Sequence, residues 1–496
     1  MTLGAWSLLS LTWPLSGDAG VFAWMGDTVY RGGSPYRDAW DTKGPAAWLP
    51  SLLMQVMTGR NTWAIRVFDI VMVVAALVAM RRIAQLIGQP SSGRIAIALY
   101  ALWYAGLDFW NSAQPDGWVA SWLIIACACA LTGGPVGALC AGALVGLATL
   151  VKPFYLGYAV VMWGIVVSMR NHSVPKRAGN SLMVCVGIGG AITALLLFVR
   201  QHGGLDAFFE GQRWNSEVYA GLADPWLTRI PMMVNQMLLM PWGIVGPIAL
   251  FGAIRPTQAH RRTIAALTIG LVGAVAGVVL QAKWWQYHWL PMLPFLAVLA
   301  DIGFDSLRAE TAGAIAGRFR RLALVLALSV AAIAPLQQIY RWSRSRGSAE
   351  SVAIYERREF RVYGRYPGSL DSLVDSVTHG MTDPPAMLVW GMHLAPQYLR
   401  GMRVPSRFAV IRPLFDGAGS EFRKRYRLAF EKELTTAPPQ WWVLPTPALL
   451  AVDEELRSRD IESYPEAAAI LHERYRQVGQ TAEWLIYERI APPAAR

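Results

Sequence analysis

The sequence is poor in charged residues. Of its 496 residues only 16% are Asp, Glu, Lys or Arg, whereas 54% are hydrophobic. Soluble domains average about 25% charged and about 45–50% apolar residues, which excludes a chain that is soluble along its whole length. We therefore predict a polytopic α-helical membrane protein that carries a separate soluble part.

Cysteine is scarce as well. All four cysteines lie inside apolar runs, and the last third of the chain has none. Cys127 and Cys129 are two residues apart, so they point in different directions on a helix. Neither a cysteine metal site nor a disulfide framework is predicted. No cofactor is expected and no metal site is assigned, although a metal requirement stays open.

Acidic residues are outnumbered by basic ones, 33 to 45, which gives a net charge of +12. The basic residues form short clusters between apolar runs, as in the cytoplasmic loops of membrane proteins. We therefore expect the lipid bilayer, and no nucleic acid, as a partner. The 22 tryptophans suit anchoring at membrane interfaces.

Apolar runs predict about 11 membrane spans in a transmembrane domain at residues 1–339, because a span needs about 20 mostly apolar residues. Several runs are shorter than that, and the first is the weakest. The runs are roughly 3–16, 63–80, 95–110, 118–133, 135–151, 154–169, 180–199, 230–253, 263–281, 286–302 and 320–338.

The positive-inside rule orients these spans. With a cytoplasmic N-terminus, every inner loop is basic, and the first outer loop (17–62) and the C-terminal part lie outside. Residues 46–57 are too short to span and are expected to form a helix at the membrane interface. The inner loops are then 81–94, 170–179, 254–262 and 303–319.

From about residue 340 the composition becomes that of a soluble domain. Residues 340–496 have a normal size for one fold, and we predict an extracytoplasmic α/β domain there. Its predicted strands are 386–391, 407–411, 441–445 and 483–490, and its predicted helices are 418–435 and 466–478.

Asp18 follows the first apolar run, in PLSGDAGVFAWMGD. An aspartate at this place often caps a helix, here one that begins at Ala19. A carboxylate at the boundary of water and lipid is also partly desolvated, which raises its basicity. It could then act as a general base that takes a proton from an attacking hydroxyl. For Asp18 alone both interpretations apply.

Lys43 lies in DTKGP, where Gly44 and Pro45 fix the chain behind it. A lysine near the interface can extend its ammonium to headgroup level, or it can bind a phosphate as a compact charge. Asp41 is either a turn residue or a partner that orients Lys43. We favour orientation.

Other ionisable residues lie near the predicted outer ends of spans. Asp116 precedes a span and could cap it. Lys152, in LVKPFY, could extend to the headgroups. Arg66 and Asp69 lie within one span, where charged groups are either functional or paired with each other.

The stretch QAKWWQYHW adds Lys283 and His288, although an isolated histidine is usually structural. In the predicted orientation, acids and amines from five distant segments reach one membrane face. Such a site suits a lipid-linked phosphate, bound among Lys43, Lys152 and Lys283, with a hydroxyl acceptor near Asp18. The cations would stabilise the charge that grows on the leaving phosphate.

The stretch GDAGVFAWMGDTVYRGGSPYRDAWDTKGP resembles the first outer loop of the GT-C glycosyltransferases. It is most similar to bacterial relatives of the protein O-mannosyltransferases and of the lipid A aminoarabinose transferase. Similar short motifs, among them GLATLVK and KWWQYHWLP, cover most of residues 10–300 in order. The resemblance implies a catalytic base at Asp18, donor-phosphate binding by Lys43, Lys152, Arg66 and Lys283, and supporting or substrate-binding roles for Asp41, Asp116, Tyr287 and His288.

The resemblance implies an inverting glycosyltransferase of the bacterial inner membrane. It would move a hexosyl or pentosyl group from a polyprenyl-phosphate donor to a glycan, lipid or protein acceptor on the periplasmic side. The sequence departs from the family in two places, since Ala19 replaces a frequent second acid and KGP replaces KPP.

Two other classes stay open. A transporter or flippase would show paired repeats and charges near the membrane midplane, and no repeat is found. A scaffold with an inactive membrane part would tolerate alanine at Asp18, Lys43 and Lys152.

Overall fold

The computed structural model is mostly helical, with a small sheet near its C-terminal end. The predicted helical class with a C-terminal α/β part is confirmed at this level. Parts of the predicted inner loops lie outside the described residues. The structure describes residues 2–169, 173–222, 224–254, 261–310, 314–361 and 365–490.

The helices of the first two thirds of the chain are α1 (Thr2–Ser10), α2 (Gly17–Tyr30), α3 (Leu49–Thr58), α4 (Ala64–Leu86), α5 (Arg94–Ala105), α6 (Pro115–Leu131), α7 (Pro135–Thr149), α8 (Tyr158–Ser168), α9 (Val174–Gln201), α10 (Leu205–Glu217), α11 (Trp226–Leu239), α12 (Gly246–Ile254), α13 (Arg261–Gln281), α14 (Leu293–Glu310) and α15 (Ala314–Ser345). Short 3-10 helices are η1 (Pro45–Ala47), η2 (Pro153–Gly157), η3 (Tyr219–Leu222), η4 (Gly243–Val245) and η5 (Gln286–Met292).

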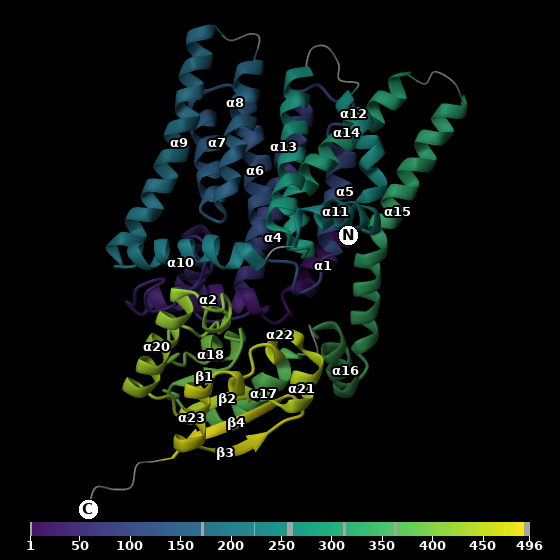
Figure 1. The fold of residues 1–496 in the computed structure, drawn as a ribbon. Coiled ribbons are helices and arrows are strands. Elements are labelled where there is room, and N and C mark those ends of the chain that lie inside the picture. The colour runs from purple at the N-terminus through teal and green to yellow at the C-terminus, as the bar shows by residue number, and fades with distance from the viewer. Residues whose placement is uncertain are drawn as a thin grey trace, which may run out of the picture.

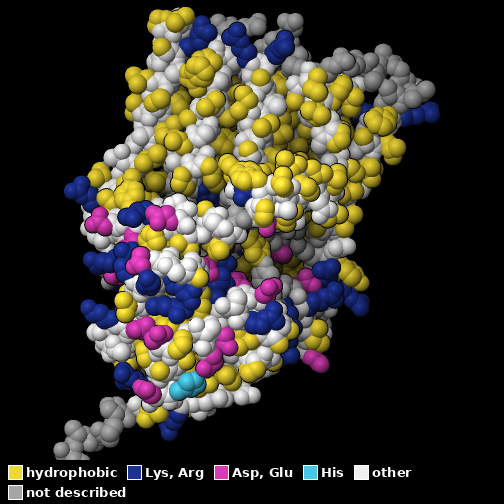
Figure 2. All heavy atoms as spheres, viewed as in Figure 1, with side chains coloured by type: hydrophobic (Ala, Val, Ile, Leu, Met, Phe, Trp, Pro, Cys, Tyr) yellow, Lys and Arg dark blue, Asp and Glu magenta, His cyan; other side chains and the backbone are white. Residues whose placement is uncertain are grey.

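The longer of these helices form a bundle, and α10 lies across its lower end, above the C-terminal sheet (Figure 1). On the face shown in Figure 2, apolar side chains cover most of the bundle and some Lys and Arg lie at its upper end, whereas Lys, Arg, Asp and Glu together gather on the lower half. This separation fits a bundle embedded in lipid and a lower half in water.

Four helical segments among the described residues are long and apolar enough to cross a membrane. They are α9, α13, α15, and η5 together with α14. Several further apolar helices have only 10–17 residues, and the first predicted run contains only the nine-residue α1. The count of about 11 spans therefore stays a prediction.

The predicted span at 230–253 is not one continuous helix. α11 meets the η4–α12 segment at an angle of 92°. Pro241 lies in the break and has no backbone N–H to donate. At Gly243 a Cβ would lie 1.9 Å from the Met237 carbonyl oxygen, so only glycine fits this turn.

The sheet has the strand order β1-β2-β4-β3. β1 (Met387–Val389) and β2 (Trp441–Pro445) are parallel, whereas β4 (Trp484–Arg489) is antiparallel to β2 and to β3 (Tyr475–Gln480). The helices around it are α16 (Ala349–Glu359), α17 (Pro367–Thr378), α18 (Ala395–Leu399), α19 (Arg412–Phe415), α20 (Glu421–Thr436), α21 (Pro447–Val452), α22 (Glu454–Arg457) and α23 (Pro465–Arg474).

The strands predicted at 386–391, 441–445 and 483–490 correspond to β1, β2 and β4, but the strand predicted at 407–411 is wrong. That segment is a turn whose Phe408 and Ile411 are buried, so its apolar residues reflect packing. The helix predicted at 466–478 is wrong at its end, because α23 stops at Arg474 and β3 begins at Tyr475. Only the first residue of β3 is buried and most of the others are polar, so its sequence does not resemble a buried strand.

The C-terminal region packs against the first loop. The Trp40 backbone N–H donates to the Arg407 carbonyl over 2.9 Å, and the Trp40 ring contacts Phe408, Tyr426 and Trp214. The predicted boundary at residue 339 falls inside α15, so the division into two domains stays a prediction.

Candidate active site

The loop that carries Lys43 is held from three sides. The Tyr36 hydroxyl donates to the Lys43 carbonyl over 2.9 Å, and the Trp48 indole N–H donates to the same hydroxyl over 3.0 Å. At Gly44 a Cβ would lie 1.9 Å from the Leu150 carbonyl oxygen. The glycine of KGP is therefore required where this loop meets the end of α7.

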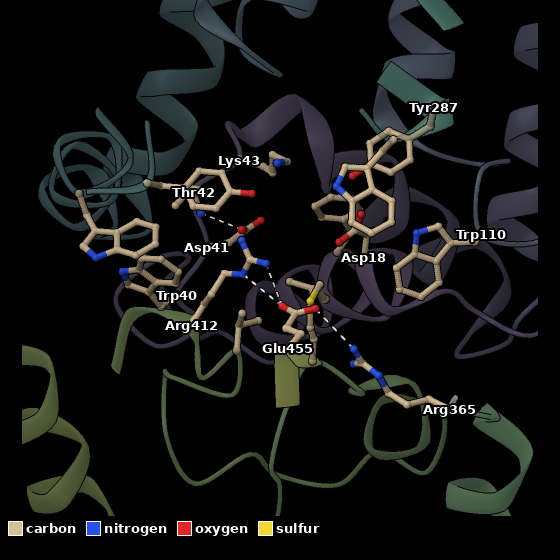
Figure 3. A pocket seen from close by; sticks show the side chains of 17 residues that line it. Asp18, Trp40, Asp41, Thr42, Lys43, Trp110, Tyr287, Arg365, Arg412 and Glu455 are labelled. Carbon is tan, nitrogen blue, oxygen red and sulfur yellow. Dashed lines mark hydrogen bonds and ion pairs between the residues drawn. The ribbon is translucent and has the colours of Figure 1, made fainter. Parts of the chain in front are cut away.

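Asp18 does not cap its helix, which corrects the simpler interpretation of this residue. Ser16 is the N-cap of α2, and its hydroxyl accepts the Ala19 N–H over 3.3 Å. Asp18 lies in the first helical turn, and its carboxylate points into a cavity (Figure 3). Burial raises the pKa of Asp18, and nearby Lys43 and Arg412 oppose this shift.

We call this space, of about 110 Å³, the Asp18 cavity. Aromatic rings form much of its wall, and the C-terminal region supplies the wall opposite α2. The aromatic side chains are Phe22, Trp40, Trp110, Trp214, Tyr219, Trp285 and Tyr287, and the C-terminal residues are Arg365, Met392, Val410, Arg412 and Glu455.

Asp41 is a second carboxylate in the Asp18 cavity. One of its oxygens accepts the Thr42 N–H over 2.7 Å, while Oδ2 is buried without a hydrogen-bond partner among the described residues. Burial raises the pKa of Asp41 to about 6, although Lys43 opposes the shift. Asp41 therefore has one oxygen available to accept a hydrogen bond from a ligand.

The second cavity, which we call the Lys152 cavity, has a volume of about 250 Å³. It brings together the predicted residues Lys43, Lys152, Lys283 and His288. Apolar side chains of two helix ends line its other side. Thr42, Lys43, Tyr219, Trp285 and Tyr287 line both cavities, so the two spaces adjoin at these residues.

The three lysines of the Lys152 cavity differ in their contacts. No hydrogen bond or ion pair reaches the ammonium of Lys43 within the part of the chain that the structure describes. Burial alone would lower its pKa, but Asp41, Tyr219 and Asp18 hold the pKa above its ordinary value. Lys43 therefore presents a fully ionised ammonium to both cavities.

Lys152 and Lys283 are already engaged. The Lys152 ammonium donates to both oxygens of Asp116, over 2.8 and 2.9 Å, and to Gln281 Oε1 over 2.7 Å. Burial lowers the pKa of Lys152 to about 8, and Asp116 opposes that shift. Lys283 donates to the Leu222 carbonyl over 3.2 Å and lies 4.7 Å from the Tyr219 ring centroid.

Asp116 and His288 contact two of these lysines, Lys152 and Lys283 respectively. Asp116 is not the cap predicted for its helix, because Gln114 occupies the N-cap position. Its carboxylate binds Lys152 and accepts the Tyr155 hydroxyl over 2.7 Å. His288 Nδ1 lies 2.5 Å from the Lys283 carbonyl oxygen, so this nitrogen carries the proton and fixes the ring.

The structure does not bring Arg66 to the predicted phosphate site. Its guanidinium is buried and donates to the carbonyls of Pro14, Phe109 and Ser112 over 2.9–3.2 Å and to the Ser112 hydroxyl over 2.7 Å. It lines neither cavity. Arg66 therefore holds the loop before α6, and its predicted contact with the donor phosphate is corrected.

The sequence analysis missed the contribution of the C-terminal region. Arg365, Arg412 and Glu455 line the Asp18 cavity but lie about 350 to 440 positions beyond Asp18 in the chain. No short motif joins them, so only the three-dimensional arrangement identifies them. No group of three His, Cys, Asp or Glu side chains suited to a metal ion occurs among the described residues.

No protein-family model matches the sequence, and no curated protein matches it. Solved structures do match. ArnT from Cupriavidus metallidurans bound to undecaprenyl phosphate aligns with a TM-score of 0.62 at 14% identity, covering 99% of this chain and 97% of that one. Its apo state gives a TM-score of 0.58 at 13% identity with the same coverage.

The oligosaccharyltransferase AglB from Archaeoglobus fulgidus aligns with a TM-score of 0.45 at 12% identity, over 91% of this chain and 71% of that one. The two ArnT structures, which cover nearly the whole of both chains, are enough to establish the architecture. The chain therefore has the fold of ArnT, in agreement with the resemblance of its sequence to the GT-C glycosyltransferases.

Proposed function

We propose that the protein is a glycosyltransferase that moves a sugar from a polyprenyl-phosphate donor to a hydroxyl acceptor with inversion at the anomeric carbon. The single observation that carries this proposal is the position of Lys43. It lies where the two cavities adjoin, and its ammonium has no hydrogen-bond or ion-pair partner within the described ranges. Asp18 lies on one side of it, and Lys152 and the apolar helix ends lie on the other.

The donor phosphate binds at this junction. Lys43 offers it three N–H donors and a full charge, and Lys283 adds a second cation. The polyprenyl chain leaves past Val151, Phe154 and Leu280, which line the Lys152 cavity where helices meet the lipid. The ArnT match was solved with undecaprenyl phosphate bound, which supports a lipid phosphate in a protein of this fold.

The sugar extends from the junction into the Asp18 cavity. The acceptor oxygen attacks the anomeric carbon while its proton passes to Asp18, and the bond from that carbon to the phosphate oxygen breaks. The electron pair leaves with the phosphate, where Lys43 stabilises it. One displacement yields the inverted glycoside and polyprenyl phosphate, and Asp18 later returns the proton to water.

The proposal includes a location. The positive-inside pattern supports an active site and a C-terminal domain on the outer face of the cytoplasmic membrane.

Comparing the cell-envelope glycans of a deletion strain with those of its parent by mass spectrometry would identify the acceptor and the sugar.

The central test uses Asp18→Asn, which keeps the size of the side chain and removes the base. Membranes that contain the wild-type chain or the variant receive undecaprenyl phosphate linked to a tritiated hexose or pentose. We expect the rate of transfer to fall by about 10²–10⁴-fold in the variant, the usual contribution of a general base. Undiminished transfer would remove Asp18 from this role.

The matched control is Asp206→Asn. Asp206 also lies in the first turn of a helix, α10, but it is exposed to solvent, and transfer by this variant should equal that of the wild type. Passage of the labelled donor across sealed vesicles without a covalent product would favour a transporter. Normal function of the alanine variants of Asp18, Lys43 and Lys152 would favour a scaffold.

A further inference from the structure

Arg412 brings the C-terminal region to the reaction centre. It is the first residue of the short helix α19, and it follows the segment whose Arg407 carbonyl binds the Trp40 N–H. Trp40 directly precedes Asp41 in the first loop. The same backbone contact therefore positions Arg412 and the loop of Asp41 relative to one another.

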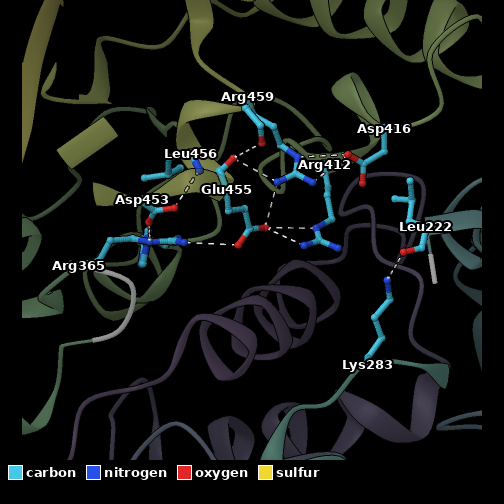
Figure 4. Close-up of polar contacts among 11 residues, drawn as sticks. Leu222, Lys283, Arg365, Arg412, Asp416, Asp453, Glu455, Leu456 and Arg459 are labelled. Carbon is cyan, nitrogen blue, oxygen red and sulfur yellow. Dashed lines mark hydrogen bonds and ion pairs between the residues drawn. The ribbon is translucent and has the colours of Figure 1, made fainter. Parts of the chain in front are cut away.

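Glu455 orients the guanidinium of Arg412. Its Oε1 accepts from Arg412 Nη2 over 2.8 Å and from Nε over 3.3 Å. Arg459 lies 3.3 Å and Arg365 3.4 Å from the same carboxylate (Figure 4). With three arginines around it, Glu455 has a pKa below its ordinary value despite its burial, and its charge is constant at neutral pH.

The arginines on either side of Glu455 have acids of their own. Arg459 binds Asp416 over 2.9 Å, and Arg365 pairs with the buried Asp453. The network therefore holds three arginines and three carboxylates, so its charges balance. Such a balanced network fixes Arg412 without leaving an uncompensated charge at the wall of the cavity.

One edge of Arg412 remains open toward the Asp18 cavity. Its Nε and Nη2 bind Glu455, whereas Nη1 has no hydrogen-bond partner in the described part of the chain. The guanidinium carbon lies 5.1 Å from the Tyr219 ring centroid. Asp18 and Arg412 thus face one cavity from opposite parts of the molecule (Figure 3).

We propose that Arg412 is a positioning residue of the reaction centre, supplied by the C-terminal region to hold a cation at the wall of the cavity that the Asp18 carboxylate enters. This inference rests on the proposed transfer reaction with Asp18 as the base. It gives the C-terminal region a part in catalysis, because Arg412 is one of the two cations, with Lys43, that act on the Asp18 carboxylate.

The sign of the effect follows from the groups that face Asp18. Burial and the charge of Glu455 favour the neutral form of Asp18, whereas Lys43, Arg412 and the Tyr287 hydroxyl favour its charged form. Removing either cation therefore makes the carboxylate harder to ionise. A base must be unprotonated to act. The facing groups are Lys43 from the first loop, Arg412 from α19, Glu455 from α22, Tyr287 from η5, and the nearby Asp41 and Lys152.

The test measures the titration of Asp18 directly in the full-length protein in lipid nanodiscs. Infrared spectra of protein labelled with ¹³C-aspartate contain a carboxyl band that is absent from Asp18→Asn. We expect its midpoint to move upward by roughly one pH unit in Arg412→Gln, as for loss of one nearby opposite charge. Arg412→Lys should restore most of the original midpoint.

Arg457→Gln is the control, because Arg457 lies on α22 beside Glu455 but lines neither cavity. The pH profile of transfer in Arg412→Gln should move upward together with this midpoint. An unchanged midpoint in Arg412→Gln, or an equal shift in Arg457→Gln, would overturn the inference. This measurement needs no donor, so it separates failure of the inference from failure of the proposed transfer.

Discussion

Two sets of buried charges in this molecule look alike in the sequence and differ in their contacts. Arg66 donates to three backbone carbonyls and one hydroxyl. Asp69, one helical turn away, accepts from the Tyr104 hydroxyl, the Trp118 indole and the Ala113 N–H. The Nε of Arg66 is buried without a hydrogen-bond partner among the described residues, but the fold itself supplies every other partner in this set.

Around Asp18 the fold leaves charges incomplete. The ammonium of Lys43 has no partner among the described residues, and one oxygen of Asp41 is buried without a donor. A buried polar group without a partner costs about 1–3 kcal/mol. The comparison therefore teaches that most donors and acceptors of Arg66 and Asp69 are used by the fold, whereas Lys43 and Asp41 keep groups that can bind the proposed ligand at a cost in stability.

Among the variants that test this comparison, the largest effect should come from Lys43→Ala. Removing the cation from the junction leaves the leaving phosphate without its main counter-charge, so we expect transfer to fall by about 10²–10³-fold. The melting temperature in detergent should not fall, because the ammonium makes no contact that the fold needs. A clear loss of thermal stability would show that Lys43 belongs with the structural charges.

Arg66→Met should lower the stability and leave the transfer rate per folded molecule nearly unchanged, the reverse of Lys43→Ala. Methionine leaves four acceptors without their donor, and we expect a loss of about 3–5 kcal/mol in the free energy of unfolding. The measurement is the melting temperature, together with the transfer rate per folded molecule, which should stay close to that of the wild type. A stable variant that fails only in transfer would return Arg66 to the donor phosphate.

The sequence predicted many of the charged residues that line the two cavities because its signals are local. Asp18, Lys43, Lys152 and Lys283 were found from position in short motifs beside apolar runs, and the structure brings all four to two adjoining cavities. Strands with continuous apolar runs, such as β2, were predicted for the same reason. Burial on both faces leaves a direct trace in composition.

What the sequence missed depends on partners far along the chain. Arg66 resembles a site residue until its acceptors near Pro14 and Phe109 are known. Arg412 resembles a surface arginine until α19 is placed against the first loop. The polar strand β3 is defined by pairing with β4 rather than by its own residues. None of these features follows from local pattern alone.

A smaller effect is expected from Asp41→Asn. Asparagine keeps the oxygen that accepts the Thr42 N–H but removes the charge, and we expect transfer to fall by about tenfold. The pKa of Asp41 is raised to about 6 from 3.8. The unfolded chain therefore ionises Asp41 at a lower pH than the folded protein does, so the free energy of unfolding falls as the pH rises between these values.

Asp41→Asn should therefore lower the rate of transfer but raise the thermal stability at neutral pH. At pH 7 the variant should melt at a higher temperature than the wild type, because the buried charge is gone. At pH 4, where the folded wild type holds the proton, the two melting temperatures should approach each other. A variant that is less stable at pH 7 would place Asp41 among the satisfied charges.

The smallest effect should come from Lys283→Met. Lys283 lines the Lys152 cavity, but its ammonium already binds the Leu222 carbonyl and faces the Tyr219 ring, and its side chain is only partly buried. A partly screened charge of this kind contributes about 0.5–1 kcal/mol, or roughly a twofold to fivefold change in the concentration of donor that half-saturates transfer. The maximal rate should not change, because Lys43 provides the charge at the leaving oxygen. An effect on the maximal rate as large as that of Lys43→Ala would mean that the phosphate lies deeper in the Lys152 cavity. Lys283 would then belong with the incomplete charges, although its ammonium already has a partner.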